Sequence, residues 1–105
     1  MSANRGLTTA LLPAYSNRPR QDAIYCFAIQ AAAEPGVMPR VLELLAKRGL
    51  IPHRWHADRV GPDGQDLAID LQVAGLERET CDYIARCLRQ IYGVEAVLTS
   101  EKMQG

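Results

Sequence analysis

One stretch of the chain decides its fold: Glu34-Pro35-Gly36-Val37-Met38-Pro39-Arg40-Val41, which lies between an apolar strand pattern and an apolar helix pattern. Pro35-Gly36 is a turn signal. Pro39 is tolerated in a first helical turn, because the N–H group that it lacks would have no partner within the helix. The stretch therefore predicts that a strand ends, the chain turns at Gly36, and a helix starts with exposed backbone N–H groups. Such a helix start favours negative charge and can hold a carboxylate or a phosphate.

The patterns on either side of this turn predict a strand and a helix. Residues 23–32 form a short, nearly continuous apolar run with aromatic and β-branched members. Such a run is typical of a central strand covered on at least one face. After the turn, apolar residues recur at helical spacing up to about Arg48, and Gly49 provides a helix stop.

The rest of the chain continues with the same two periods. We expect a strand at residues 50–60, a turn at 61–65 and a second strand at 67–73. A helix should follow at residues 76–92 and a last strand at 94–100. Pro52 has no N–H group to donate to a ladder, so the strand that contains it should lie at a sheet edge or start irregularly. The element order is therefore β-α-β-β-α-β.

This order predicts an α+β, ferredoxin-like fold: a four-stranded antiparallel sheet with both helices on one face. We divide the chain into a flexible N-terminal arm at residues 1–22, the folded domain at residues 23–102, and a tail at residues 103–105. One sheet face has no helix, and an edge strand needs cover or a partner. Both features indicate a homodimer that forms through the sheet.

Composition narrows the classes of function. The 105 residues suit one domain, and 12 basic against 12 acidic residues give zero net charge. This balance argues against nucleic-acid binding, which needs a basic face. Three dispersed cysteines, without C-x-x-C spacing, indicate reduced thiols in a cytoplasmic protein. No apolar run approaches the ~20 residues that cross a membrane.

Several site chemistries find no support in the residue pattern. His53 and His56 would lie on opposite faces of a regular strand, which disfavours a shared metal site. We find no arrangement for covalent catalysis and no glycine loop for a nucleotide cofactor. An RNA-binding sheet would need aromatic side chains on its open face, where Ala68, Asp70 and Gln72 are expected instead. We therefore predict no catalytic residue, no metal and no cofactor.

A family resemblance rests on five segments: Ile24-Tyr25-Cys26-Phe27-Ala28-Ile29, Glu34-Pro35-Gly36-Val37, Arg40-Val41, Leu44 and Arg48-Gly49. In a β-α-β-β-α-β order, these resemble an ACT domain over residues 23–102. Within that family, the chain is most similar to the short regulatory small subunit of acetolactate synthase. The resemblance implies a non-catalytic protein whose partner, the catalytic large subunit, carries the reaction of branched-chain amino acid synthesis.

The resemblance also implies how such a domain works. ACT domains usually pair side by side into an eight-stranded sheet, and a small amino-acid effector sits at the pair interface. Its carboxylate would meet N–H groups of the loop and helix start, and its amino group would meet the partner's second strand. On this basis the effector-binding residues are Ala33, Glu34, Pro35, Gly36, Val37, Met38, Ile51 and Pro52. Effector binding would bias the paired domains and hence the attached enzyme, which is allosteric coupling between two sites.

Two positions depart from the family pattern. Ala33 stands where valine-responsive small subunits commonly have Asn, and Ile51 followed by Pro52 stands where Asn is frequent. Each lost hydrogen bond to a charged ligand should cost about 1.5–3 kcal/mol. Either the effector pocket is degenerate, or it takes another, more apolar ligand.

These observations predict a regulatory subunit of acetolactate synthase. An alternative is a stand-alone ACT amino-acid sensor that acts on another enzyme or regulator. A small enzyme of ferredoxin-like fold is a third class, for which the residues offer no convincing acid–base pair.

Overall fold

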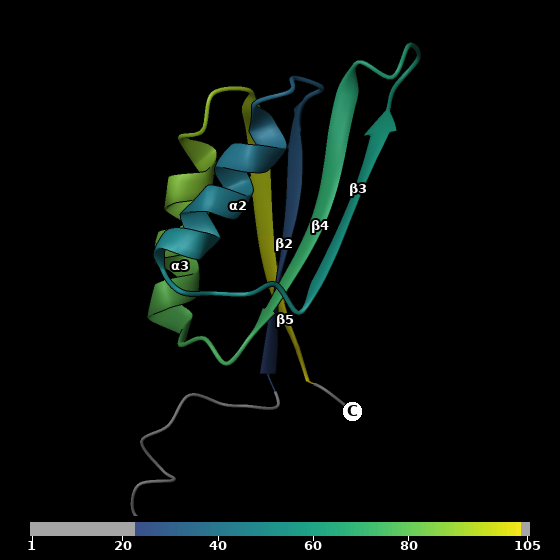
Figure 1. Ribbon diagram of the computed structural model, residues 1–105. Coiled ribbons are helices and arrows are strands. Elements are labelled where there is room, and N and C mark those ends of the chain that lie inside the picture. Colours follow the sequence, from purple (N-terminus) through teal and green to yellow (C-terminus); the bar gives the residue numbers. More distant parts are fainter. Residues whose placement is uncertain (1–22, 104–105) are drawn as a thin grey trace, which may run out of the picture.

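The computed structural model describes residues 23–103. They form six elements in the order β-α-β-β-α-β (Figure 1), namely β2 (Ala23–Ala32), α2 (Val37–Lys47), β3 (Arg54–Val60), β4 (Asp66–Ala74), α3 (Arg78–Arg89) and β5 (Val94–Met103). The predicted N-terminal arm, residues 1–22, and residues 104–105 lie outside the described part of the chain.

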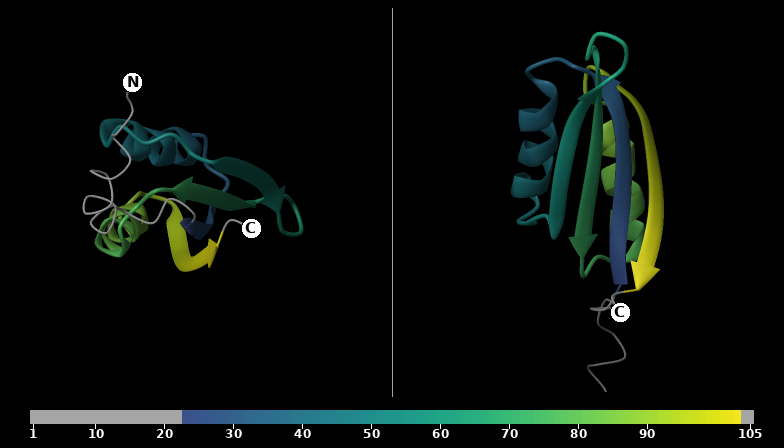
Figure 2. Two further views of the ribbon diagram at one scale, coloured as in Figure 1. Left: turned by 90° about the horizontal axis from the view of Figure 1, so that it is seen from below. Right: turned by 90° about the vertical axis from the view of Figure 1, so that its right-hand side faces the viewer.

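The four strands form one antiparallel sheet in the order β3-β4-β2-β5. Both helices lie on the same side of this sheet (Figures 1 and 2). The predicted ferredoxin-like arrangement is confirmed. β3 and β5 are the two edges, so the prediction that the strand after Pro52 lies at an edge is also confirmed.

The core lies between the sheet and the two helices. Phe27 stands at its centre, with no exposed surface and with Leu71 opposite it on β4. Alternate residues of β2 and β4 face the helices, as the strand period requires. The other large, fully buried side chains are Leu45, Ile84, Leu88, Val37, Val41, Val73 and Cys81.

Three elements differ from their predicted bounds by three residues or more. β3 starts at Arg54 rather than residue 50, because Pro52 has no N–H to donate and pairing with β4 begins only where the His53 N–H reaches the Gln72 carbonyl at 2.7 Å. β5 runs on to Met103, since its polar residues still pair with β2.

The second helix, α3, is shorter than its apolar pattern predicts. It starts after Glu77, which has an extended backbone (φ −82°, ψ 154°), and it is capped by Gln90. Leu76 and Ile91 extend the apolar stripe beyond both ends because they pack against the core from the flanking turns.

Candidate functional site

The loop that follows β2 is held on both of its sides. The Ala32 N–H donates to the Gly93 carbonyl at 2.8 Å, which ties the loop to the turn before β5. The Ala33 N–H donates to the Gln65 carbonyl at 2.9 Å, which ties it to the start of β4. The loop is therefore fixed between two neighbouring connections at one end of the sheet (Figure 1).

The start of α2 leaves two of the predicted donors available. Gly36 is the N-cap residue, and no side chain caps the helix there. The Val37 N–H is already used, because it donates to the Glu34 carbonyl at 3.1 Å. The N–H groups of Gly36 and Met38 have no acceptor within residues 23–103. Such orphan donors at a helix start are ready to bind an anion.

The charges around this helix start leave its positive end uncompensated. The first turn of α2 contains no acidic residue. Arg40, one turn into the helix, folds its guanidinium back over Gly36 and makes no ion pair with any described residue. The Cγ of Glu34, which precedes the helix, lies 3.9 Å from the place that a Cβ of Gly93 would take. A cation at the positive end of a helix dipole is unfavourable. A bound anion would therefore stabilise both the helix start and the Arg40 guanidinium.

A cavity of about 210 Å³ opens beside the loop. It is lined by Ala33, Glu34, Pro35, Met38, Arg59 and Leu67. Four of the eight predicted effector residues thus share one cavity wall. Arg59 and Leu67, from the β3–β4 hairpin, were not predicted. Their pairing in register across the hairpin places both on the helix side of the sheet, and the period-2 alternation was the signal that could have suggested this.

The other predicted residues do not line this cavity. Gly36 is half-buried at the helix start, and Val37 has no exposed surface because it belongs to the core. Ile51, 85% exposed, and Pro52 follow the far end of α2. The segment that holds them crosses the opposite end of the domain from the loop (Figure 1). Within one copy of the chain, the two halves of the predicted site therefore do not meet.

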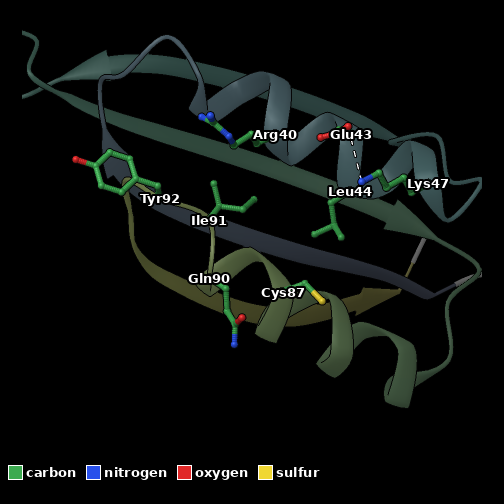
Figure 3. Close-up of a pocket in the computed structure, with 8 residues that line it drawn as sticks. All are labelled: Arg40, Glu43, Leu44, Lys47, Cys87, Gln90, Ile91 and Tyr92. Atoms are coloured by element: carbon green, nitrogen blue, oxygen red, sulfur yellow. Dashed lines mark ion pairs between the residues drawn. The ribbon is translucent and has the colours of Figure 1, made fainter.

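A second, larger groove of about 380 Å³ lies between the two helices (Figure 3). It is lined by Arg40, Glu43, Leu44, Lys47, Cys87, Gln90, Ile91 and Tyr92. Arg40 and Tyr92 lie at the end of the groove near the start of α2. Further along the groove, Lys47 Nζ forms an ion pair with Glu43 Oε2 at 3.8 Å. We place the candidate site at the smaller cavity, because only that one is formed by the loop before α2.

Two titratable groups among residues 23–103 have raised pKa values. Burial raises the pKa of the Cys81 thiol to about 11. Burial, and then the nearby Glu101 carboxylate, raises the pKa of Tyr25. His56 Nε2 lies 2.9 Å from an oxygen of Asp58, whereas His53 precedes the strand. Across the described residues, no group of three His, Cys, Asp or Glu side chains could hold a metal ion.

The cysteines and Trp55 take mainly structural places. All three cysteines are free thiols; Cys81 is buried, and Cys26 and Cys87 are half-buried. Trp55 is half-buried on the helix side of β3 and packs against the core. No helix between residues 23 and 103 is long and apolar enough to cross a membrane.

Fold and loop together define a small α+β domain with an anion-ready helix start. Residues 17–104 match the ACT-like domain, and the chain belongs to this family. A search of curated proteins finds no match.

Solved structures share the fold at low sequence identity. One is the ACT domain of GTP pyrophosphokinase from Chlorobium tepidum, with a TM-score of 0.62, 12% identity, and coverage of 73% of this chain and 96% of that one. An uncharacterized protein from Thermotoga maritima gives a TM-score of 0.60 at 22% identity, with coverage of 74% and 94%. The regulatory subunit of aspartate kinase from Thermus thermophilus gives a TM-score of 0.59 at 17% identity. The match covers 77% of this chain and 52% of that subunit.

Proposed function

We propose that this chain is a non-catalytic regulatory subunit, which dimerises, binds a small amino-acid effector at the loop before α2, and modulates acetolactate synthase. One observation carries the effector site: the predicted loop forms the wall of a cavity and leaves the N–H groups of Gly36 and Met38 without acceptors. Membership of the ACT-like family supports the regulatory role. The solved structures of similar fold include a subunit named as regulatory, that of aspartate kinase.

The edge strand β3 supports pairing with a second copy. Its open-face residues are Arg54, His56 and Asp58, at alternate positions. If two β3 strands pair antiparallel about His56, each Arg54 stands opposite the partner's Asp58. Opposite charges across paired strands contribute about 0.2–1 kcal/mol each, and the pairing also satisfies the free backbone groups of the edge. The expected dimer has one continuous eight-stranded sheet.

Sedimentation equilibrium tests this pairing. The Arg54→Asp variant places two acids opposite each other twice and should weaken the dimer by about tenfold, from the lost attraction and the new repulsion. The double variant Arg54→Asp with Asp58→Arg should restore the dimer, because it only exchanges the two charges. A dissociation constant that is the same for the single variant and the natural chain would contradict this register.

Mixing experiments test the enzyme that is regulated. The chain should co-purify with the catalytic subunit of acetolactate synthase from the same organism and should raise its activity. A heat-denatured sample of the chain serves as control. Failure to bind the catalytic subunit at micromolar concentration would contradict this part of the proposal.

The alternative function, a stand-alone ACT sensor for another enzyme or regulator, is favoured by the apolar character of three predicted effector residues. Ala33 contributes only a methyl group at a position where valine-responsive small subunits commonly carry Asn, and Ile51 and Pro52 offer no polar side chain. A sensor of this kind would bind an amino acid but leave acetolactate synthase unchanged, so the two experiments together separate the two functions.

A further inference from the structure

The cavity beside the loop carries one charged group that the family resemblance does not assign, the guanidinium of Arg59. Arg59 lies near the hairpin end of β3, opposite Leu67, and both line the cavity. It is exposed and close to the loop, whereas the half of the predicted site at Ile51 and Pro52 lies at the other end of the domain. Any ligand that fills this cavity therefore meets Arg59 from the same protomer.

Arg59 is held in place but keeps its charge available. Its Nε donates to the carbonyl of Gly64 at 2.8 Å, which fixes the side chain against the hairpin turn. No carboxylate within the described part of the chain lies within ion-pair distance of it, whereas Arg54 and Arg78 are paired with Asp70 and Asp82. Only the Nε position is used, so the two Nη groups can still donate hydrogen bonds.

The other walls of the cavity are mostly apolar. Ala33, Pro35, Met38 and Leu67 supply hydrocarbon, and Glu34 is the acidic residue of the lining. The planar guanidinium matches a carboxylate, to which it can donate two hydrogen bonds. The volume of about 210 Å³ corresponds to roughly seven water molecules at ~30 Å³ each. A ligand with a carboxylate and a short hydrocarbon chain fits both the size and the chemistry.

We infer that Arg59 binds the carboxylate of the effector and makes this cavity selective for a small apolar carboxylic acid. The class includes apolar amino acids and the corresponding 2-oxo acids, which share the carboxylate and the hydrocarbon chain. The inference rests on the proposed effector-sensing function and names the ligand class and a specificity residue for that same site.

Isothermal titration calorimetry with four probes tests the inference. L-valine, L-leucine and 3-methyl-2-oxobutanoate carry the carboxylate, and isobutylamine carries a similar hydrocarbon chain without it. The natural chain should bind at least one of the three acids and bind the amine at least about tenfold more weakly, since hydrogen bonds to a charged group are lost. A comparison of the affinities for the two amino acids and for the oxo acid shows which member of the class is preferred.

Variants then locate the effect. Arg59→Gln should weaken binding of the preferred acid by about tenfold or more, and Arg59→Lys by less, because Lys keeps the charge but not the fork. Arg86→Gln, an exposed residue of α3 that does not line the cavity, is the matched control and should bind as the natural chain does. Circular dichroism confirms that each variant is folded.

The outcomes separate this inference from the proposed function. If the natural chain binds the acids and Arg59→Gln binds them equally well, the role of Arg59 is wrong and effector sensing stands. Equal affinity for isobutylamine and the acids would likewise overturn the carboxylate selectivity, without the need for any variant. If the natural chain binds none of the three acids but does bind a polar amino acid, only the ligand class is wrong. Binding of no acid and no amino acid would overturn both.

Discussion

Two glycines flank α2, and the structure predicts opposite responses when each is replaced by alanine. Gly49, just after the helix, has φ of +69°, where an L-residue is strained. Gly36, the N-cap residue, has φ of −82° and ψ of −8°, a conformation that alanine adopts freely. Although the loop was predicted from its Pro-Gly turn, its glycine is therefore not required by the backbone.

The expected changes in the free energy of unfolding follow from these backbone angles. Gly49→Ala should lower the free energy of unfolding by about 1–2 kcal/mol, the cost of a left-handed conformation for a residue with a Cβ. At Gly36 the new methyl group would collide only with the guanidinium of Arg40, which is exposed and flexible. A weaker N-cap, at up to about 1 kcal/mol, is offset by about 0.4–1 kcal/mol from the stiffer unfolded chain. The net change for Gly36→Ala should lie within about 1 kcal/mol of zero.

Urea denaturation measures both variants, and an unchanged slope with denaturant shows that only stability has changed. A double-mutant cycle with Arg40→Ala isolates the collision, because Gly36→Ala should cost nothing from crowding once the guanidinium is absent. A loss of more than about 2 kcal/mol for Gly36→Ala in both backgrounds would refute the reasoning, since it would mean that the helix start needs glycine for its backbone.

Three further predictions concern the core, a buried thiol and a helix–strand contact. Phe27→Ala should lower the free energy of unfolding by about 3–5 kcal/mol in urea, because Phe27 has no exposed surface; a loss below about 1 kcal/mol would contradict its central place. The pKa of the Cys81 thiol is raised from 9.0 to about 11 in the folded chain. Because the unfolded thiol loses its proton first, stability should be unaffected by Cys81 below pH 9.0 and should fall as the pH rises toward about 11. Denaturation of Cys81→Ala across the same range should show a shallower fall, and identical slopes would count against the shift. Arg89 Nη2 donates to the Val97 carbonyl at 2.9 Å, so Arg89→Met should cost about 0.5–1.5 kcal/mol in thermal unfolding, whereas Arg86→Met, a neighbour without this bond, should cost less.

The sequence was most informative where local signals bounded an element on both sides. The strand Ala23–Ala32 has its predicted bounds, and the first helix ends at Lys47, within one residue of its predicted end. Their apolar periods are strong, and the Pro35-Gly36 turn and Gly49 stop each pattern. Residues 50–53 look like strand from their side chains, but a strand needs a partner. Of these four residues, only His53 has an N–H group that donates to the neighbouring strand β4.

The site was predicted in part for a similar reason. The loop from Ala33 to Met38 is contiguous, so its turn chemistry could be read directly. Arg59 lies 21 residues after Met38 in the chain, and its place beside the loop depends on how the β3–β4 hairpin packs against the end of β2. Ile51 and Pro52 follow the far end of α2, so under the proposed pairing only a second copy could bring them to the loop. Long-range packing, rather than local pattern, decides these positions.

A thermal-shift screen of the chain against the twenty amino acids tests the central claim most directly, namely that this domain senses an amino acid. A ligand present at ~100 times its dissociation constant adds about 2.7 kcal/mol to the free energy of unfolding. For a domain of this size, each kcal/mol raises the melting temperature by about 4–8 °C. We therefore expect a rise of about 10 °C or more with at least one apolar amino acid. An unchanged melting temperature with all twenty would contradict the claim that the loop before α2 binds an amino acid.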